Sequence, residues 1–336
     1  MSTNLSEQEL KRLVGDLLLA NGVEPVSAGA VASSIVSAER DGAFSHGFTR
    51  LPGFISSLAS GWVTGSPKMI VSHPAPAVVH VDAANGFAQG ALARAKDLAM
   101  ARARANGVCA ISIHDSHHFG CLWPDVEPFG EAGFVCLAFV NSRSRMVGPG
   151  ARKAVLGTNP MAFAMPRPGH PPLVWDQASS VIAHGDILLA AKAGHTLPPD
   201  AGVDKFGAVS RDPQAVLDGG ALMPFGARKG FLIALMVEVL AAALTGSRFG
   251  FEDESPGKPG AVTSNAGEML ILIDPMRTGA TDFGARVEQL LAALADAGSS
   301  RMPGDRRYQN RAKALETGIP VDDDTHRLLT HVEPNP

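Results

Sequence analysis

Apolar residues near the N-terminus recur at the spacing of amphipathic helices. The first pattern covers Leu10–Leu18 and follows a Ser6–Glu9 capping box, which together predict a helix. Similar patterns predict helices over about 27–40 and 49–60. Between these two, residues 43–50 form a polar stretch with a glycine at a helix junction, a place where functional sites are often built.

The rest of the chain alternates short apolar runs with helical patterns. The runs predict strands at 79–82, 108–113, 134–140, 161–165, 173–175 and 269–273. The helical patterns predict helices at 88–104, 181–192, 231–244 and 283–297. Two stretches are predicted to be irregular, the segment 114–118 and the polar last forty residues. The alternation of strands and helices is typical of the α/β class.

A nucleotide-binding sheet of the common Rossmann type is not supported by any motif. The sequence contains no G-x-G-x-x-G, and the glycines of Gly148–Gly150 fail its spacing. A dinucleotide, if one binds, therefore requires another architecture.

Composition excludes several classes of protein. With 45% apolar and 18% charged residues among 336, the chain is globular and not disordered, and a net charge of −4 argues against nucleic acid as a partner. The longest nearly uncharged run, 231–244, is shorter than the roughly 20 residues that span a bilayer. Three cysteines without a C-x-x-C pair, together with the lack of a signal peptide, predict a reducing, cytoplasmic location.

The polar segment Ser45-His46-Gly47 with Arg50 has the residue types of a catalytic site. Histidine is the usual proton donor near neutral pH, and the arginine fork suits capture of a carboxylate. The alternative is a helix cap beside a surface histidine and arginine. A Ser45/His46/Asp186 hydrolase is disfavoured, because adjacent side chains diverge in extended backbone and no G-x-S-x-G elbow is present.

A metal site is a second possibility. His114, His117 and His118 have i, i+3 and i+4 spacing, which would suit zinc on a helix. Because these residues directly follow a predicted strand, we expect a loop in which the histidines bond to backbone, and zinc remains the alternative.

Four further segments could hold a ligand. Thr158, in the turn 156–160, offers a hydroxyl to a ligand. The segment 175–180 ends a predicted strand and starts a helix, where Asp176 and Ser179 are candidate caps. The two other segments, 224–230 with Arg228 and Lys229 before a helix and 301–307 with three arginines, suit an anion such as a phosphate or the 2′-phosphate of NADP. Solvated charge is the alternative for both.

These pieces, in this order, resemble the malate/L-lactate dehydrogenase family, which is distinct from the Rossmann-type lactate dehydrogenases. The motifs are Ser45-His46-Gly47 with Arg50, Ser116–Gly120, Gly157–Pro160, Pro224–Gly230 and Met302–Gly304. Within that family the chain looks most like the Δ1-piperideine-2-carboxylate/Δ1-pyrroline-2-carboxylate reductases, on the segments 122–128, 176–180, 194–195 and 249–252. The sequence departs from common patterns at Ala227-Arg228 and Ser210-Arg211.

The resemblance implies a fold, a cofactor and a domain division. It implies an α/β, non-Rossmann fold with a largely antiparallel cofactor-binding sheet and flanking helical regions, in a homodimer. We expect residues 1–72 with 282–336 to form a helical substrate and dimerisation region. Residues 73–281 are then an NAD(P)-binding sheet domain with a helical insert at about 181–245.

The resemblance also assigns roles residue by residue. His46 matches the proton donor, supported by Ser45 and Asp186, while Arg50 and Thr158 match positions that hold the substrate carboxylate. The implied cofactor contacts are His46, Gly47, Phe48, Thr49, Arg50, Asp176, Gln177, Ala178, Arg228, Lys229, Arg301, Met302, Pro303, Gly304, Asp305, Arg306 and Arg307.

The resulting hypothesis is an NADPH-dependent reductase of cyclic imino acids, with NADH as a possible substitute and no metal. It would reduce Δ1-pyrroline-2-carboxylate to L-proline and Δ1-piperideine-2-carboxylate to L-pipecolate, with His46 protonating the nitrogen. The alternatives are a 2-keto acid reductase of the same family and a metal-dependent hydrolase or lyase that uses the three histidines.

Overall fold

The computed structural model describes residues 3–151 and 153–330. Its α-helices are α1 (Glu7–Ala20), α2 (Pro25–Arg40), α3 (Leu51–Ala59), α4 (Ala88–Asn106), α5 (Trp123–Glu131), α6 (His184–Ala193), α7 (Pro213–Leu217), α8 (Arg228–Glu238), α9 (Phe283–Asp296), α10 (Asp305–Thr317) and α11 (Asp323–Thr330). Its strands are β1 (Thr3–Leu5), β2 (Ile70–Ala75), β3 (Val78–Phe87), β4 (Val108–His117), β5 (Val135–Val140), β6 (Met146–Val147), β7 (Ala154–Leu156), β8 (Met161–Arg167), β9 (His170–Gln177), β10 (Gly202–Val203), β11 (Val209–Ser210), β12 (Ala221–Leu222), β13 (Asn265–Ile273) and β14 (Ile319–Val321).

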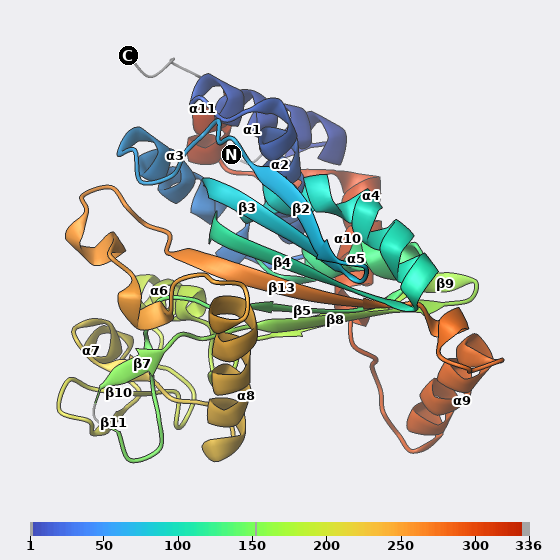
Figure 1. The fold of residues 1–336 in the computed structure, drawn as a ribbon. Helices are drawn as coiled ribbons and strands as arrows, with labels where there is room; N and C mark the ends of the chain where they lie inside the picture. Colours follow the sequence, from blue (N-terminus) through green and yellow to red (C-terminus); the bar gives the residue numbers. More distant parts are fainter. Residues whose placement is uncertain (1–2, 152, 331–336) are drawn as a thin grey trace.

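A seven-stranded sheet forms the centre of the molecule (Figure 1). Its order is β2-β3-β4-β13-β5-β8-β9, and every pair except β3–β4 is antiparallel. The prediction of a largely antiparallel sheet is therefore confirmed. Strands β3, β4 and β5 run in the same direction and are separated by helices along the chain, which accounts for the strand–helix alternation in the sequence. Strand β13 inserts between β4 and β5 and runs antiparallel to both, so these two strands are not neighbours.

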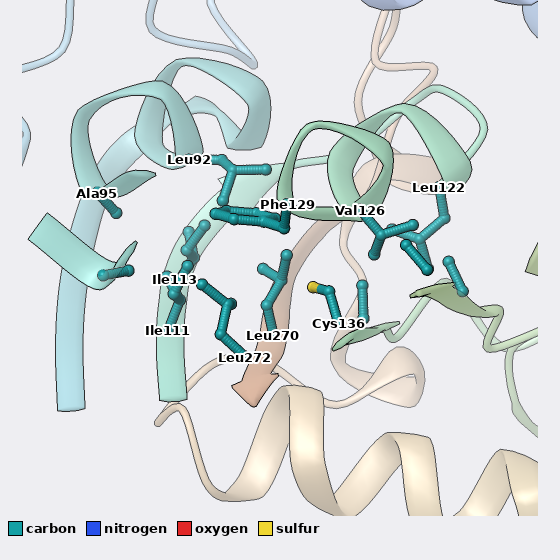
Figure 2. Close-up of a cluster of buried hydrophobic side chains, with 14 of the residues drawn as sticks. Leu92, Ala95, Ile111, Ile113, Leu122, Val126, Phe129, Cys136, Leu270 and Leu272 are labelled. Atoms are coloured by element: carbon teal, nitrogen blue, oxygen red, sulfur yellow. The ribbon is translucent and has the colours of Figure 1, made fainter. Parts of the chain in front are cut away.

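Helices cover both faces of this sheet. On one face, α4 and α5 pack against inward residues of β4 and β13, among them Ile111, Ile113 and Leu270 (Figure 2). On the other face, α8 and its π-helical continuation at 239–243 pack on Phe139 and Met269. The central strands are buried on both sides, which explains why their sequences are continuously apolar.

A small second sheet lies beside the main one. Its order is β11-β10-β12-β6-β7, and it shares an apolar cluster with α6 that includes Met146 and Ile187. At the opposite side, α1, α2 and α3 form a helical layer whose core includes Ile319 and Val321 of β14. Both chain ends thus meet in one region, where β1 pairs with β14. The predicted domain boundaries stay a prediction.

Most predicted elements are confirmed, including the Ser6 cap, whose hydroxyl accepts the Glu9 backbone N–H. The irregular C-terminus is wrong, because α10, β14 and α11 occupy it. Helix α10 has no fully buried residue and is anchored by charge, so it lacks the apolar signal that marks a packed helix. Its Arg311 bonds both Asp41 of α2's end and Glu127 of α5.

Two further findings bear on composition. All three cysteines are free and buried, as expected for a chain without disulfides. Among the described residues, no helix combines the length and apolar character needed to cross a membrane.

Candidate active site

A cavity of about 880 Å³ brings together segments that are far apart along the chain. Predicted site residues in its wall are Ser45, His46, Arg50, Thr158, Asp176, Gln177, Ala178, Asp186, Arg301, Met302, Pro303, Gly304, Arg306 and Arg307. Predicted residues outside the wall are Gly47, Phe48, Thr49, Asp305, Arg228 and Lys229. Phe48 belongs to the helical core, and the two cations lie exposed at the start of α8.

Ser45 and His46 lie in a single 3₁₀ turn in the connection that follows α2. The Ser45 hydroxyl oxygen is 2.9 Å from Nδ1 of His46. The expectation that these adjacent side chains diverge is wrong, because it assumed extended backbone and the segment 44–46 is helical. The carboxylate of Glu39 accepts the Phe48 N–H and lies against Gly47, which fixes the following turn.

His46 lies in a positively charged, largely buried environment. Burial, followed by the charges of Arg50 and His118, lowers the pKa of His46 to about 4. The imidazole is therefore neutral at pH 7 in the free protein. An anion placed on Arg50 would offset one of these causes and raise the pKa of His46.

Arg50 is held in place from two sides. Its Nε donates to the carbonyl oxygen of Ser45 at 2.7 Å, and its guanidinium stacks over the Phe119 ring at 4.9 Å. Asp186, in the first turn of α6, faces the cavity and its charge opposes the effect of burial, which lowers the pKa of Arg50. Within the described residues, Asp186 makes no side-chain hydrogen bond to Ser45 or His46, so the predicted relay is joined only between the latter two.

Thr158 is positioned by the buried residue that follows it. Asn159 adopts a left-handed φ of 37° and donates from Nδ2 to the Ala234 carbonyl at 2.9 Å and to the Glu238 carboxylate at 2.6 Å. Its Oδ1 accepts the Ser142 N–H, and the Ser142 hydroxyl lies 3.4 Å from that of Thr158. A rigid polar network therefore presents Thr158 to the cavity.

Asp176 caps a helix, but a different one from that expected. Its Oδ2 accepts the backbone N–H groups of Leu122 and Trp123 at the start of α5, at 3.0 and 3.2 Å. The helix predicted over 181–192 corresponds to α6, but it begins three residues later than expected, at His184. The sequence alone could not show that the backbone N–H groups at the start of α5 lie next to Asp176.

The three arginines of 301–307 also line the cavity. Arg307 stacks over Trp123 at 4.3 Å and lies 3.6 Å from Asp176, while Arg301 and Arg306 are exposed. Gly304 has φ 92°, and a Cβ there would stand 3.1 Å from the Val174 carbonyl oxygen. These cations line the cavity beside a close turn, an arrangement that suits an anionic cofactor.

The proposed three-histidine metal set does not form. Residues 114–117 continue β4, so the expected loop is wrong, and side chains of successive strand residues point to opposite faces. His114 stacks on His80, and Nε2 of His117 lies 2.9 Å from Oδ1 of Asn85. His118 instead lies with Asp125 and Glu268, whose donor atoms are within 4.8 Å of one another. Burial raises the pKa of Glu268 to about 8.

Three basic residues of the cavity wall escaped sequence reasoning. Arg143 and Arg145 follow the buried strand β5, and His184 begins α6. Only their position in the sequence could have indicated these residues, because polar residues just after a buried strand often line a site.

Comparison with known proteins agrees with this geometry. The model of the malate/L-lactate dehydrogenase family matches residues 5–330. The chain is 48% identical to the Δ(1)-pyrroline-2-carboxylate/Δ(1)-piperideine-2-carboxylate reductase of Pseudomonas syringae pv. tomato, over 94% of this chain and 92% of that protein. It is 37% identical to the (2R)-3-sulfolactate dehydrogenase (NADP(+)) of Chromohalobacter salexigens, over 96% of this chain and 97% of that protein.

A solved structure is similar over the whole fold. The crystal structure of Δ1-piperideine-2-carboxylate reductase from Pseudomonas syringae pv. tomato superposes with a TM-score of 0.96 at 46% identity, covering 98% of this chain and 100% of that one. Fold and cavity define an oxidoreductase that uses a nicotinamide cofactor. The chain belongs to the malate/L-lactate dehydrogenase family.

Proposed function

We propose that the chain reduces the cyclic imino acids Δ1-pyrroline-2-carboxylate and Δ1-piperideine-2-carboxylate to L-proline and L-pipecolate. The observation that carries the proposal is the pairing of His46 with Arg50 in one turn of the cavity wall, with Ser45 bonded to both. The close relative named for these substrates supports the same reaction.

The chemistry needs an acid and a carboxylate clamp. The nicotinamide supplies a hydride to C2 of the C=N bond, which leaves an electron pair on the nitrogen. His46 would protonate that nitrogen, and the hydrogen bond between the Ser45 hydroxyl and Nδ1 would support its ring. Arg50 and Thr158 would fix the carboxylate, which orients one face of the imine toward the hydride. The bound carboxylate also raises the pKa of His46 when a proton is required.

NADPH is the cofactor that we propose in preference to NADH. The cations Arg301, Arg306 and Arg307 gather at one end of the cavity, where they suit the extra phosphate of NADPH. One relative is named for NADP(+), which supports this preference. Gln177 and Ala178, at the end of β9, would contact the same cofactor.

We also propose a homodimer built on α8, in the cytoplasm. One side of α8 and its π-helical extension leaves Leu232, Leu235, Met236, Val239 and Leu244 between 41% and 64% exposed. A second copy would cover this apolar side. Arg228 and Lys229 begin α8 and lie outside the cavity of their own chain. Packing of a second copy on α8 would give these two residues a role.

The test is a substrate and cofactor panel. We expect oxidation of NADPH with both cyclic imines, faster than with NADH, and loss of turnover in His46→Ala. Pyruvate, oxaloacetate and other 2-keto acids assayed in parallel address the alternative reaction of the family. Absence of turnover with either imine, alongside turnover of a keto acid, would replace the proposal with that alternative.

A further inference from the structure

A cluster of arginines at the Arg50 end of the cavity exceeds what a single carboxylate needs. Arg143 and Arg145 line the cavity with Arg50, and Arg145 lies close enough to the other two to feel their charges. Burial, followed by the charges of Arg143 and Arg50, lowers the pKa of Arg145 to about 10. Such crowding of like charges costs free energy that a bound anion would recover.

Two of the three arginines, Arg143 and Arg50, have a carboxylate of the protein that opposes their charge. Asp253, whose side chain is buried, lies 3.6 Å from Nε of Arg143, and Asp186 faces Arg50. Arg145 has no carboxylate within ion-pair distance among the described residues. Among those residues its side-chain hydrogen-bond partner is Nε2 of His184, which accepts from the guanidinium. Because burial and the neighbouring arginines lower the pKa of His184 to about 3, that ring adds no charge.

Arg145 lies at the substrate end of the cavity. Its guanidinium bonds Nε2 of His184, and the next residue, Gly185, lies against a terminal nitrogen of Arg50, so Arg145 and Arg50 share this side of the cavity. The cations proposed for the cofactor phosphate belong to the separate segment 301–307. Most of the N–H donors of Arg145 therefore remain for a ligand that occupies the Arg50 and Thr158 end.

We propose that Arg145, with Arg143 beside it, forms a second anion subsite that accepts a second carboxylate on the substrate. The substrate class is then a cyclic imino dicarboxylate, held at its 2-carboxylate by Arg50 and at its other carboxylate by Arg145. This inference rests on the proposed function and extends it from the two simple imines to imines that carry a second carboxylate. The same cations could instead meet a cofactor phosphate, and the experiment separates these two anions.

Inhibition by planar analogues of the cyclic imines tests the subsite without turnover. The probes are pyridine-2-carboxylate and the pyridine-2,4-, 2,5- and 2,6-dicarboxylates, and their binding to the protein with and without NADPH is measured by calorimetry. We expect at least one dicarboxylate to bind about tenfold more tightly than the monocarboxylate, the gain from one charged hydrogen-bonded contact. Arg145→Met should abolish that advantage, and Arg145→Lys should keep part of it.

Two measurements complete the design. Arg248→Met is the matched control, because Arg248 pairs with Glu254 and does not line the cavity. Affinity for NADPH should be unchanged in Arg145→Met. Equal binding of all probes, or an advantage that survives Arg145→Met, would overturn the subsite, and weakened NADPH binding in its place would assign Arg145 to the cofactor. Failure of the proposed function shows separately, as absent turnover of both simple imines by the unaltered chain.

Discussion

Gly185 leaves room for the guanidinium of Arg50. A Cβ built on Gly185 would stand 2.6 Å from a terminal nitrogen of Arg50, and 3.3 Å from Cβ of Ser45. The first turn of α6 therefore sets where the proposed carboxylate clamp can lie. Because the clashing atom ends a flexible side chain, a larger residue would displace the clamp without breaking the fold.

Gly185→Ala should accordingly impair substrate binding selectively. We expect the KM for Δ1-pyrroline-2-carboxylate to rise about tenfold, the loss of one well-aligned charged hydrogen bond. The KM for NADPH and the melting temperature should change little. Gly29→Ala is the control, since a Cβ there meets nothing within 4 Å. An unaltered KM for the imine would show that Arg50 does not bind the carboxylate.

The pH dependence of turnover should follow His46. Burial and the charge of Arg50 lower the pKa of His46 to about 4 in the free protein, and the reaction needs the protonated ring. We therefore expect kcat/KM to decline as the pH rises above about 4. Substrate carboxylate on Arg50 raises the pKa of His46, so the decline in kcat should lie at higher pH. His46→Ala should lower kcat by about 10²- to 10⁴-fold and remove this limb of the profile. Coincident limbs in the unaltered enzyme would contradict the link between Arg50 and His46.

Asn159→Ala should destabilise the fold and disturb Thr158 together. The change removes the 2.6 Å bond to Glu238 and leaves that buried carboxylate short of a donor, at a cost of about 2 kcal/mol. Urea denaturation gives the free energy of unfolding, and steady-state assays give the accompanying loss of kcat/KM. Asn106→Ala, in an exposed contact with Pro76, should change stability by less than about 0.5 kcal/mol. Equal stability of the two variants would exclude the structural role of the network.

Glu39→Gln should alter how stability depends on pH. Burial raises the pKa of Glu39 from the ordinary 4.5 to about 7. Between those values the folded protein keeps a proton that the unfolded chain loses, so this contribution is complete below pH 4.5 and is lost as the pH rises through 7. The variant should lack that decline, so its stability relative to the parent should be about 3 kcal/mol higher at pH 8 than at pH 4.5. Denaturation curves at both pH values measure it, and parallel pH dependences would rule it out.

Charge placed on the exposed side of α8 should separate the proposed homodimer. We expect the double variant Leu232→Glu with Val239→Glu to elute with half the mass of the parent in light-scattering chromatography, because apolar contact would be replaced by like charges. Leu315→Glu on α10, where the leucine is 70% exposed, is the control and should leave the mass unchanged. A parent chain that is already monomeric would refute the interface.

The sequence predicted local elements better than the relations between them. The helix begun by Ser6 and the strands around Ile111 and Leu270 have strong periodic or continuous apolar signals, and the structure confirms them. Helix α10 was missed because ion pairs to Asp41 and Glu127 anchor it, and such contacts leave no periodic mark.

For the site, motifs identified residues that do meet in one cavity, including His46, Arg50 and Thr158. They could not show the hydrogen bond between Ser45 and His46, which depends on a 3₁₀ turn. Nor could they find Arg145, whose proposed role depends on the lack of an ion pair with any carboxylate among the described residues and not on any pattern along the chain.

The place of β13 in the main sheet has a consequence for how the chain assembles during synthesis. Residues 265–273 complete the middle of a sheet whose neighbours, β4 and β5, are translated more than a hundred residues earlier. Until that segment leaves the ribosome, the two earlier strands have unpaired edges where their partner belongs. Such long-range closure slows folding and exposes the nascent chain to aggregation. The growing polypeptide therefore carries these two unpaired strand edges until the last fifth of its synthesis.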